Sequence, residues 1–148
     1  MLLHGSCAAL AGEGVLLIAP PGGGKSDLLL RLIGRGWRLV ADDQVSLSVA
    51  DGGPVAAPPA ALAGALEVRG LGLLVGLDWA CAPLRLVARL VGRAEVARLP
   101  APERWRAAGA DLPLLHLDPW GPAAPDLLAM ALHVLAGRTA MRAGAFAA

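Results

Sequence analysis

The chain alternates short apolar runs with glycine- and proline-rich breaks, a pattern typical of strands joined by tight loops. The apolar run over residues 14–19 predicts a buried strand that ends at a Pro-Pro-Gly-Gly-Gly loop. Residues 26–33 carry apolar side chains at helical spacing, with an acidic residue in the first turn and glycines after the last, which predicts a helix. Residues 37–41 predict a second buried strand. Residues 45–49 alternate Val-Ser-Leu-Ser-Val and predict a half-exposed strand that ends in a turn at Asp51-Gly52-Gly53.

The second half has a less regular pattern. Two more strands and a helix are predicted, over residues 70–77, 84–91 and 125–136, and the buried face of the helix is expected to carry Leu127, Leu128, Ala131, Leu132 and Leu135. We expect a loop or sheet edge at 54–59, a short helix at 60–66, a surface loop with one helical turn at 99–113, and a frayed tail from Arg138 onward. Strands mixed with few helices indicate an α/β domain with a mixed sheet.

Composition narrows the possible classes of protein. A chain of 148 residues with 56% hydrophobic residues can bury a full core as one domain, 1–148, without disulfides or metals. The 13 basic and 12 acidic residues form no basic cluster, so neither nucleic acid nor an anionic membrane is an expected partner. No run approaches the roughly 20 apolar residues of a membrane span, and no signal peptide is visible. Two cysteines fit a reducing compartment, so we expect a cytoplasmic protein.

Lys25 is the only lysine among the 13 basic residues, and it lies in a phosphate-binding pattern. Residues 19–26, Ala-Pro-Pro-Gly-Gly-Gly-Lys-Ser, fit the Walker A motif with alanine in place of its first glycine. The glycines let backbone N–H groups turn toward phosphate oxygens, the lysine reaches the β and γ phosphates, and the Ser26 hydroxyl suits Mg²⁺. The alternative is a glycine-rich turn without a ligand, but its position between strand and helix favours nucleotide or other polyphosphate binding.

Acidic residues follow the second predicted strand. Asp42 and Asp43 leave that strand beside the phosphate loop, where one carboxylate could hold Mg²⁺ and the other could accept a proton from a substrate hydroxyl. Glu67 stands in an otherwise apolar stretch, two residues before Arg69, and either binds a ligand or forms an ion pair within the sheet. We expect Trp120 and the other three tryptophans to serve packing or interfaces, because no basic residues interleave them.

Taken in chain order, these motifs resemble the catalytic domain of HPr kinase/phosphorylase. The resemblance rests on His4-Gly5, the loop at 19–26, the stretch Arg-Gly-Trp-Arg-Leu-Val-Ala-Asp-Asp-Gln-Val at 35–45, and Glu-Val-Arg-Gly-Leu-Gly at 67–72. It extends to about Leu99 and is weak afterwards. It implies an α/β P-loop kinase domain with a mixed β-sheet, similar to phosphoenolpyruvate carboxykinase.

The resemblance also implies an activity and its residues. The activity is ATP-dependent phosphorylation of a serine of HPr, or of a paralogue, the phosphocarrier of the sugar phosphotransferase system. Many family members also reverse this reaction with phosphate, which releases pyrophosphate. The implied catalytic residues are His4, Lys25, Asp43 as the base, and Arg98. The implied Mg²⁺ ligands are Ser26, Asp42 and Glu67. The nucleotide would be held by Ala19, Pro20, Pro21, Gly22, Gly23, Gly24, Lys25, Ser26 and Asp27.

The sequence also bears on the oligomeric state, and it departs from the family pattern in several places. Family members form hexamers, and a mean hydropathy of +0.59 favours a homo-oligomer here. Because the chain begins almost at His4, we expect a form that consists of the catalytic domain only. Residues 117–122 lack the basic residues of the family's phosphorolysis loop, so we expect weak or absent phosphorolysis. Two other functions stay open: a small-molecule P-loop kinase with Arg104 and Arg106 as a minimal lid, and a non-catalytic nucleotide or phosphate sensor.

Overall fold

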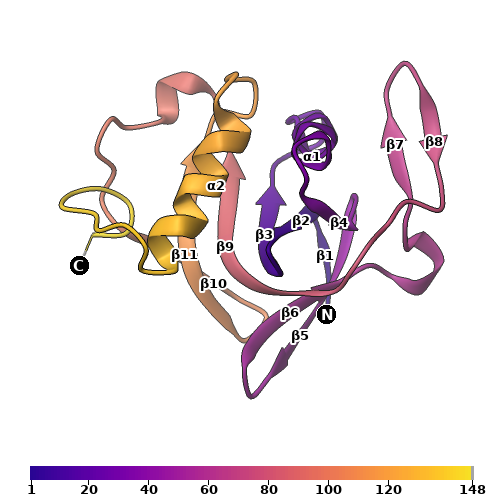
Figure 1. Ribbon diagram of the computed structural model, residues 1–148, viewed down its shortest axis with the longest axis horizontal. Coiled ribbons are helices and arrows are strands. Elements are labelled where there is room, and N and C mark those ends of the chain that lie inside the picture. Colours follow the sequence, from indigo (N-terminus) through magenta and orange to yellow (C-terminus); the bar gives the residue numbers. More distant parts are fainter. Residues whose placement is uncertain (148) are drawn as a thin grey trace.

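The computed structural model describes residues 1–147, in which nine strands form one curled, mixed sheet (Figure 1). The order β1-β5-β6-β9-β3-β2-β4 is extended by β11 beside β9 and by β10 beside β11. A separate hairpin, β7–β8, projects away from the body of the molecule. The strands are β1 (Leu2–His4), β2 (Ser6–Leu10), β3 (Glu13–Ile18), β4 (Arg38–Ala41), β5 (Gln44–Ala50), β6 (Gly53–Ala57), β7 (Leu66–Val68), β8 (Gly72–Leu74), β9 (Ala82–Leu90), β10 (Glu103–Ala107) and β11 (Ala110–Leu117).

The centre of the sheet is parallel. Strand β9 pairs in parallel with β3 on one side and with β11 on the other, whereas the remaining pairings are antiparallel. Ile18 lies opposite Arg89, and Leu117 lies opposite Leu90, so the carboxyl ends of all three strands meet at one edge. Ligands of open α/β sheets bind outside this edge.

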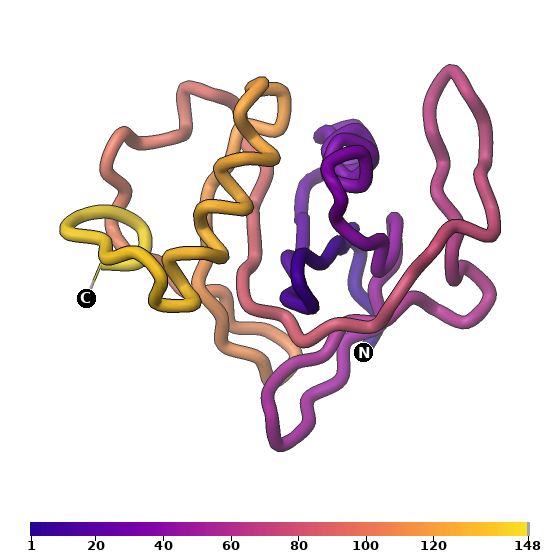
Figure 2. Tube along the Cα trace, in the orientation of Figure 1, coloured from indigo at the N-terminus to yellow at the C-terminus, as the bar shows by residue number. Residues whose placement is uncertain are grey.

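Two helices cover one face of the sheet, α1 (Lys25–Gly34) and α2 (Ala124–Leu135). Side chains of β3 alternate between the two faces: Val15 and Leu17 belong to the core cluster under the helices, and Leu16 belongs to the cluster on the other face. That second cluster fills the curl of the sheet, where Leu47 of β5 and Leu112 of β11 are buried. Burying each such leucine stabilises the fold by about 1.5–3 kcal/mol. Figure 2 follows the chain through this arrangement.

Most of the predicted elements are confirmed. The strands expected near 14–19, 37–41, 45–49 and 84–91 are present, and both helices begin and end within a residue or two of their predicted bounds. The predicted turn at residues 51–53 joins β5 to β6.

The largest error concerns residues 99–113, which the sequence predicts as a surface loop. This stretch contributes β10 and the start of β11, which form an antiparallel hairpin. Pro113 is tolerated because the pairing of β11 with β9 begins only at Leu114, so its missing N–H is not needed there. Proline therefore signals a strand position outside the β9 ladder here, and not a loop.

Five smaller predictions are also wrong. Residues 54–59 are mostly a strand, β6, that pairs with both β5 and β9. The short helix is a 3₁₀ turn over Ala60–Leu62, and the strand at 70–77 shrinks to β8. Leu127 is 43% exposed, whereas Leu128, Ala131 and Leu132 of α2 are buried as predicted. The tail does not fray, because Ala145 is buried in the core.

The described residues include no helix that is both long enough and apolar enough to span a membrane.

Candidate active site

The loop between β3 and α1 is shaped by its glycines. Gly22 and Gly24 have φ of +76° and +93°, in the left-handed region that favours glycine. A Cβ at Gly23 would lie 2.7 Å from the Cβ of Ala19, so a larger residue does not fit there. Gly24 caps α1 without a side-chain hydrogen bond, and the first N–H groups of a helix have no partner within it. This end of α1 therefore presents backbone donors and a positive dipole to an anion.

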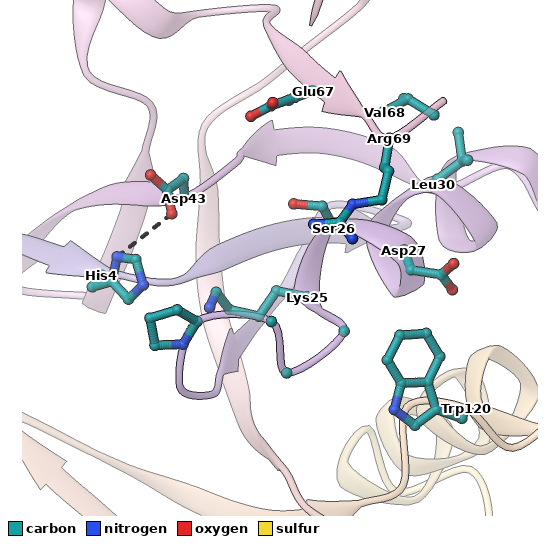
Figure 3. A pocket seen from close by; sticks show the side chains of 14 residues that line it. His4, Lys25, Ser26, Asp27, Leu30, Asp43, Glu67, Val68, Arg69 and Trp120 are labelled. Carbon is teal, nitrogen blue, oxygen red and sulfur yellow. Dashed lines mark ion pairs between the residues drawn. The ribbon is translucent and has the colours of Figure 1, made fainter. Parts of the chain in front are cut away.

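Lys25 is only 7% exposed, and its Nζ donates a hydrogen bond to the Ala19 carbonyl at 3.1 Å. The side chain thus folds back along the loop, which places its positive charge beside the backbone donors. Residues 21–27 line a cavity of about 480 Å³ (Figure 3). Of the residues implied to hold a nucleotide, Ala19 and Pro20 alone do not line the cavity; Ala19 instead anchors the lysine.

Asp42 connects the end of β4 to the loop. Its Oδ1 accepts hydrogen bonds from Ser26 Oγ at 2.9 Å and from Ser6 Oγ at 3.0 Å, and its Oδ2 accepts one from the Glu67 backbone N–H at 3.4 Å. Ser6 is fully buried and also accepts a hydrogen bond from the Asp43 N–H at 3.3 Å. One carboxylate therefore fixes the phosphate-loop serine, strand β2 and hairpin β7–β8 together.

Asp43 lines the phosphate cavity itself, whereas Asp42 lies behind Ser26 and does not line it. Its φ is +66°, a left-handed conformation that aspartate tolerates better than most residues. Gly5 N–H donates to the Asp43 carbonyl at 3.0 Å, which keeps this turn against the start of β2. The carboxylate is largely exposed and lies 3.5 Å from His4 Nδ1 (Figure 3). Asp43 is thus an accessible carboxylate, free of the hydroxyl contacts that occupy Asp42, at one end of the phosphate cavity.

Glu67 and Arg69 reach the cavity from hairpin β7–β8 (Figure 3). The strand that carries Glu67 therefore lies across the cavity from the phosphate loop. Arg98 is different: it is exposed and does not line this cavity, whereas its neighbours Ala97 and Pro100 line a second, smaller cavity with His116. The structure does not bring Arg98 to the site, which corrects the role implied for it by the resemblance.

Comparison with known proteins identifies the family. The model of the HPr Serine kinase C-terminal domain matches residues 1–76. The chain belongs to this family. Among curated relatives, the HPr kinase/phosphorylase of Clostridium tetani (strain Massachusetts / E88) is 44% identical over 72 residues, 49% of this chain and 24% of that protein. The HPr kinase/phosphorylase of Clostridium beijerinckii is also 44% identical over 72 residues. The matched segment spans about a quarter of the length of these relatives.

A solved structure has the same fold as this chain. The structure titled Hpr(Ser) kinase/phosphatase from Coxiella burnetii superposes with a TM-score of 0.74, covering 93% of this chain and 90% of that chain at 22% sequence identity. The likeness extends well beyond residues 1–76, so the second half of the chain keeps the fold where its sequence has diverged. The predicted α/β domain with a mixed sheet is confirmed.

The oxygen donors near the loop fit the chemistry of Mg²⁺. Within residues 1–147, no three His, Cys, Asp or Glu side chains are gathered as a preformed metal cage. Mg²⁺ is usually held by one or two carboxylates with water and substrate phosphates, so such a cage is not required. The Ser26 hydroxyl and the Asp42 carboxylate are already in contact at the edge of the phosphate loop, and Glu67 lines the cavity opposite. These three residues could hold the ion.

The sequence did not predict the roles of two residues in this site. Ser6 has no spacing signal, since it comes near the phosphate loop only through the pairing of β2 with β3 and β4. Trp120 was expected only to serve packing or an interface, and it also lines the cavity, 61% exposed. Arg104 and Arg106, the candidate lid, pair with Asp111 on hairpin β10–β11 and do not line the cavity.

Proposed function

We propose that this protein is an ATP-dependent protein-serine kinase that acts on HPr or an HPr-like phosphocarrier of the phosphotransferase system. The observation that carries the proposal is that Asp43 and the phosphate loop line one cavity in a chain of this family. A phosphoryl donor and an acceptor hydroxyl could therefore meet there. The names of the curated relatives and of the Coxiella protein support the choice of acceptor.

The proposed mechanism depends on positioning and charge. Lys25 and the N–H groups at the start of α1 would hold the phosphates of ATP. Asp43 would accept the proton of the substrate serine hydroxyl while the serine oxygen bonds to the γ phosphorus of ATP. In the same step the bond from that phosphorus to the β-phosphate oxygen would break, which releases ADP. His4, beside Asp43, would orient that carboxylate. Mg²⁺, held by Ser26, Asp42 and Glu67, would offset negative charge on the phosphate oxygens when bound.

Transfer of label from γ-labelled ATP to purified HPr in the presence of Mg²⁺ tests the proposal. Wild type is expected to label a serine of HPr, and Asp43→Asn is expected to lose about 10²–10⁴-fold in rate, the usual contribution of a general base. Asp51→Asn, the same change in an exposed turn between β5 and β6, is the matched control and should retain the wild-type rate. Full activity of Asp43→Asn would remove Asp43 from the mechanism. ATP binding without any transfer would favour a sensor.

We also propose that phosphorolysis is weak, because the stretch Leu117–Pro122 that ends beside the loop has no basic side chain to hold an attacking phosphate. Rapid release of pyrophosphate from phospho-HPr and phosphate would contradict this.

Self-association is proposed as well, with a hexamer implied by the family resemblance and the cytoplasm as the compartment. Leu71, Leu73 and Val75 on and after hairpin β7–β8 are at least 69% exposed, an apolar group that association would cover. Light scattering would measure the mass in solution, and a monomer at micromolar concentration would contradict it.

A further inference from the structure

The cavity has two chemically different ends. His4, Asp43 and Glu67 lie at one end, where the acceptor chemistry is proposed to take place. At the other end, beyond Lys25, the indole of Trp120 lies close to Asp27 (Figure 3). Leu30, on the next turn of α1, also lines the cavity and is partly exposed, but it lies on the opposite side of Asp27 from Trp120 in Figure 3. The exposed indole next to a polyphosphate site is an apolar surface that the phosphates themselves do not use.

The parallel centre of the sheet explains why Trp120 is there. Because β3, β9 and β11 run in the same direction, the segment after β11 emerges beside the loop after β3. A Cβ added to Gly24 would lie 3.1 Å from Trp120 Cζ2 and 3.0 Å from Pro119 Cγ. The tryptophan therefore packs against the backbone of the phosphate loop, while most of its surface remains open to the cavity.

Hydrogen bonds hold this segment in place. The Trp120 N–H donates to Asp118 Oδ1 at 3.0 Å. From α1, the Arg31 guanidinium donates to the Pro119 carbonyl and, at 3.4 Å, to the Gly121 carbonyl. Arg31 is itself paired with Asp27 at 2.9 Å. The segment that carries Trp120 is thus attached to the helix that begins at the phosphate site, so ring and phosphate donors keep a fixed relation.

We propose that Trp120 is the platform on which the base of the bound nucleotide stacks, while the phosphates extend along the loop toward Asp43. This inference rests on the proposed nucleotide binding and assigns the end of the site that binds the nucleoside. A rigid aromatic face is the group that a planar base prefers. Stacking accepts every base, so ATP and GTP should bind with similar affinity.

Calorimetry with two probes separates base stacking from phosphate binding: Mg-ATP, and Mg-tripolyphosphate, which has no base. Trp120→Ala is expected to bind Mg-ATP about tenfold more weakly, which is within the range for loss of one stacked base, and to bind tripolyphosphate as wild type does. Trp120→Phe should recover most of the affinity for ATP. Trp79→Ala is the matched control, since Trp79 is also exposed but lies outside the cavity.

Other results of these measurements would contradict the proposal that the base stacks on Trp120. If Trp120→Ala weakens ATP and tripolyphosphate equally, the ring only supports the loop. If it weakens neither but slows transfer to HPr, Trp120 contacts the acceptor protein instead. Thermal melts of all variants verify that they are folded. Failure of the kinase proposal is distinguishable, because it would appear as ATP binding with the expected Trp120 dependence but no transfer. A wild-type protein that binds neither probe would overturn both.

Discussion

Residues 1–76 and residues 77–147 contribute to this molecule in different ways. The first half carries His4, the phosphate loop, the Asp42-Asp43 pair and Glu67, and it is the half that the family model matches. The second half supplies β9, β11 and α2, and only Trp120 among its residues lines the cavity. Yet both halves share one core, since β9 lies between β3 and β11, and one buried cluster joins Leu17 to Leu86. Residues 1–76, which carry the chemical groups and match the family model, therefore share their core with residues 77–147, which the family model does not match.

Removal of the second half tests most directly whether residues 1–76 depend on it. A chain ending at Gly76 loses β9, the parallel partner of β3, and α2, which covers the helical face of the sheet. We expect this chain to have no cooperative thermal transition and no affinity for tripolyphosphate, because the remaining apolar surface has nothing to pack against. Circular dichroism and calorimetry would measure both. A cooperative melt of the truncated chain would show that residues 1–76 form a domain by themselves.

Each half of the chain contains one cysteine, and the two thiols should differ in their reactivity. Cys7 is in β2 and fully buried, and burial raises the pKa of its thiol, so the reactive thiolate is disfavoured. Cys81, just before β9, is exposed. A thiol reagent should modify Cys81 rapidly and Cys7 roughly a thousandfold or more slowly, at the rate of opening of the fold. Cys81→Ser should remove the fast phase alone. Rapid modification of both thiols in the folded protein would mean that β2 opens locally.

Core substitutions test how evenly the halves share stability. Leu86→Ala in β9 and Leu17→Ala in β3 remove fully buried side chains from the same cluster, so each should lower the free energy of unfolding by about 2–5 kcal/mol. Leu127→Ala on the exposed side of α2 is the control, with a change within about 0.5 kcal/mol. Urea denaturation would measure all three. A loss for Leu86→Ala as small as that of Leu127→Ala would show that β9 contributes little to the shared core.

The smallest expected effect lies on hairpin β10–β11. Hydrogen bonding by Arg104, with help from Arg106, lowers the pKa of the exposed Asp111. A carboxyl whose pKa is lower in the folded protein stabilises it at neutral pH, and this contribution is lost as the pH falls through that folded pKa. Asp111→Asn should therefore reduce Tm by at most about 3 °C at pH 7, and by less at about pH 3. Scanning calorimetry at both pH values would detect it; an equal difference at both would assign the effect to packing.

The sequence correctly predicted elements whose signals are local. The phosphate loop, its strand and its helix follow from a few adjacent residues, and the alternation of residues 45–49 is confirmed in β5. Hairpin β10–β11 could not be recognised in this way, because Pro113 reads as a loop residue until its position outside the pairing with β9 is known.

The site likewise combines residues with local sequence signals and residues that only the tertiary structure brings together. By itself, the sequence determined which chemical groups are present: the glycines of the loop, the single lysine, the two aspartates and Glu67, each placed by its own strand or turn. Only the tertiary structure decided which distant groups join them. Parallel pairing of β3, β9 and β11 brings Trp120 to the loop, antiparallel pairing of β2 brings Ser6 to Asp42, and the path of the chain after β9 leaves Arg98 outside the cavity. Strand order is set by burial across the whole sheet, which no short segment encodes.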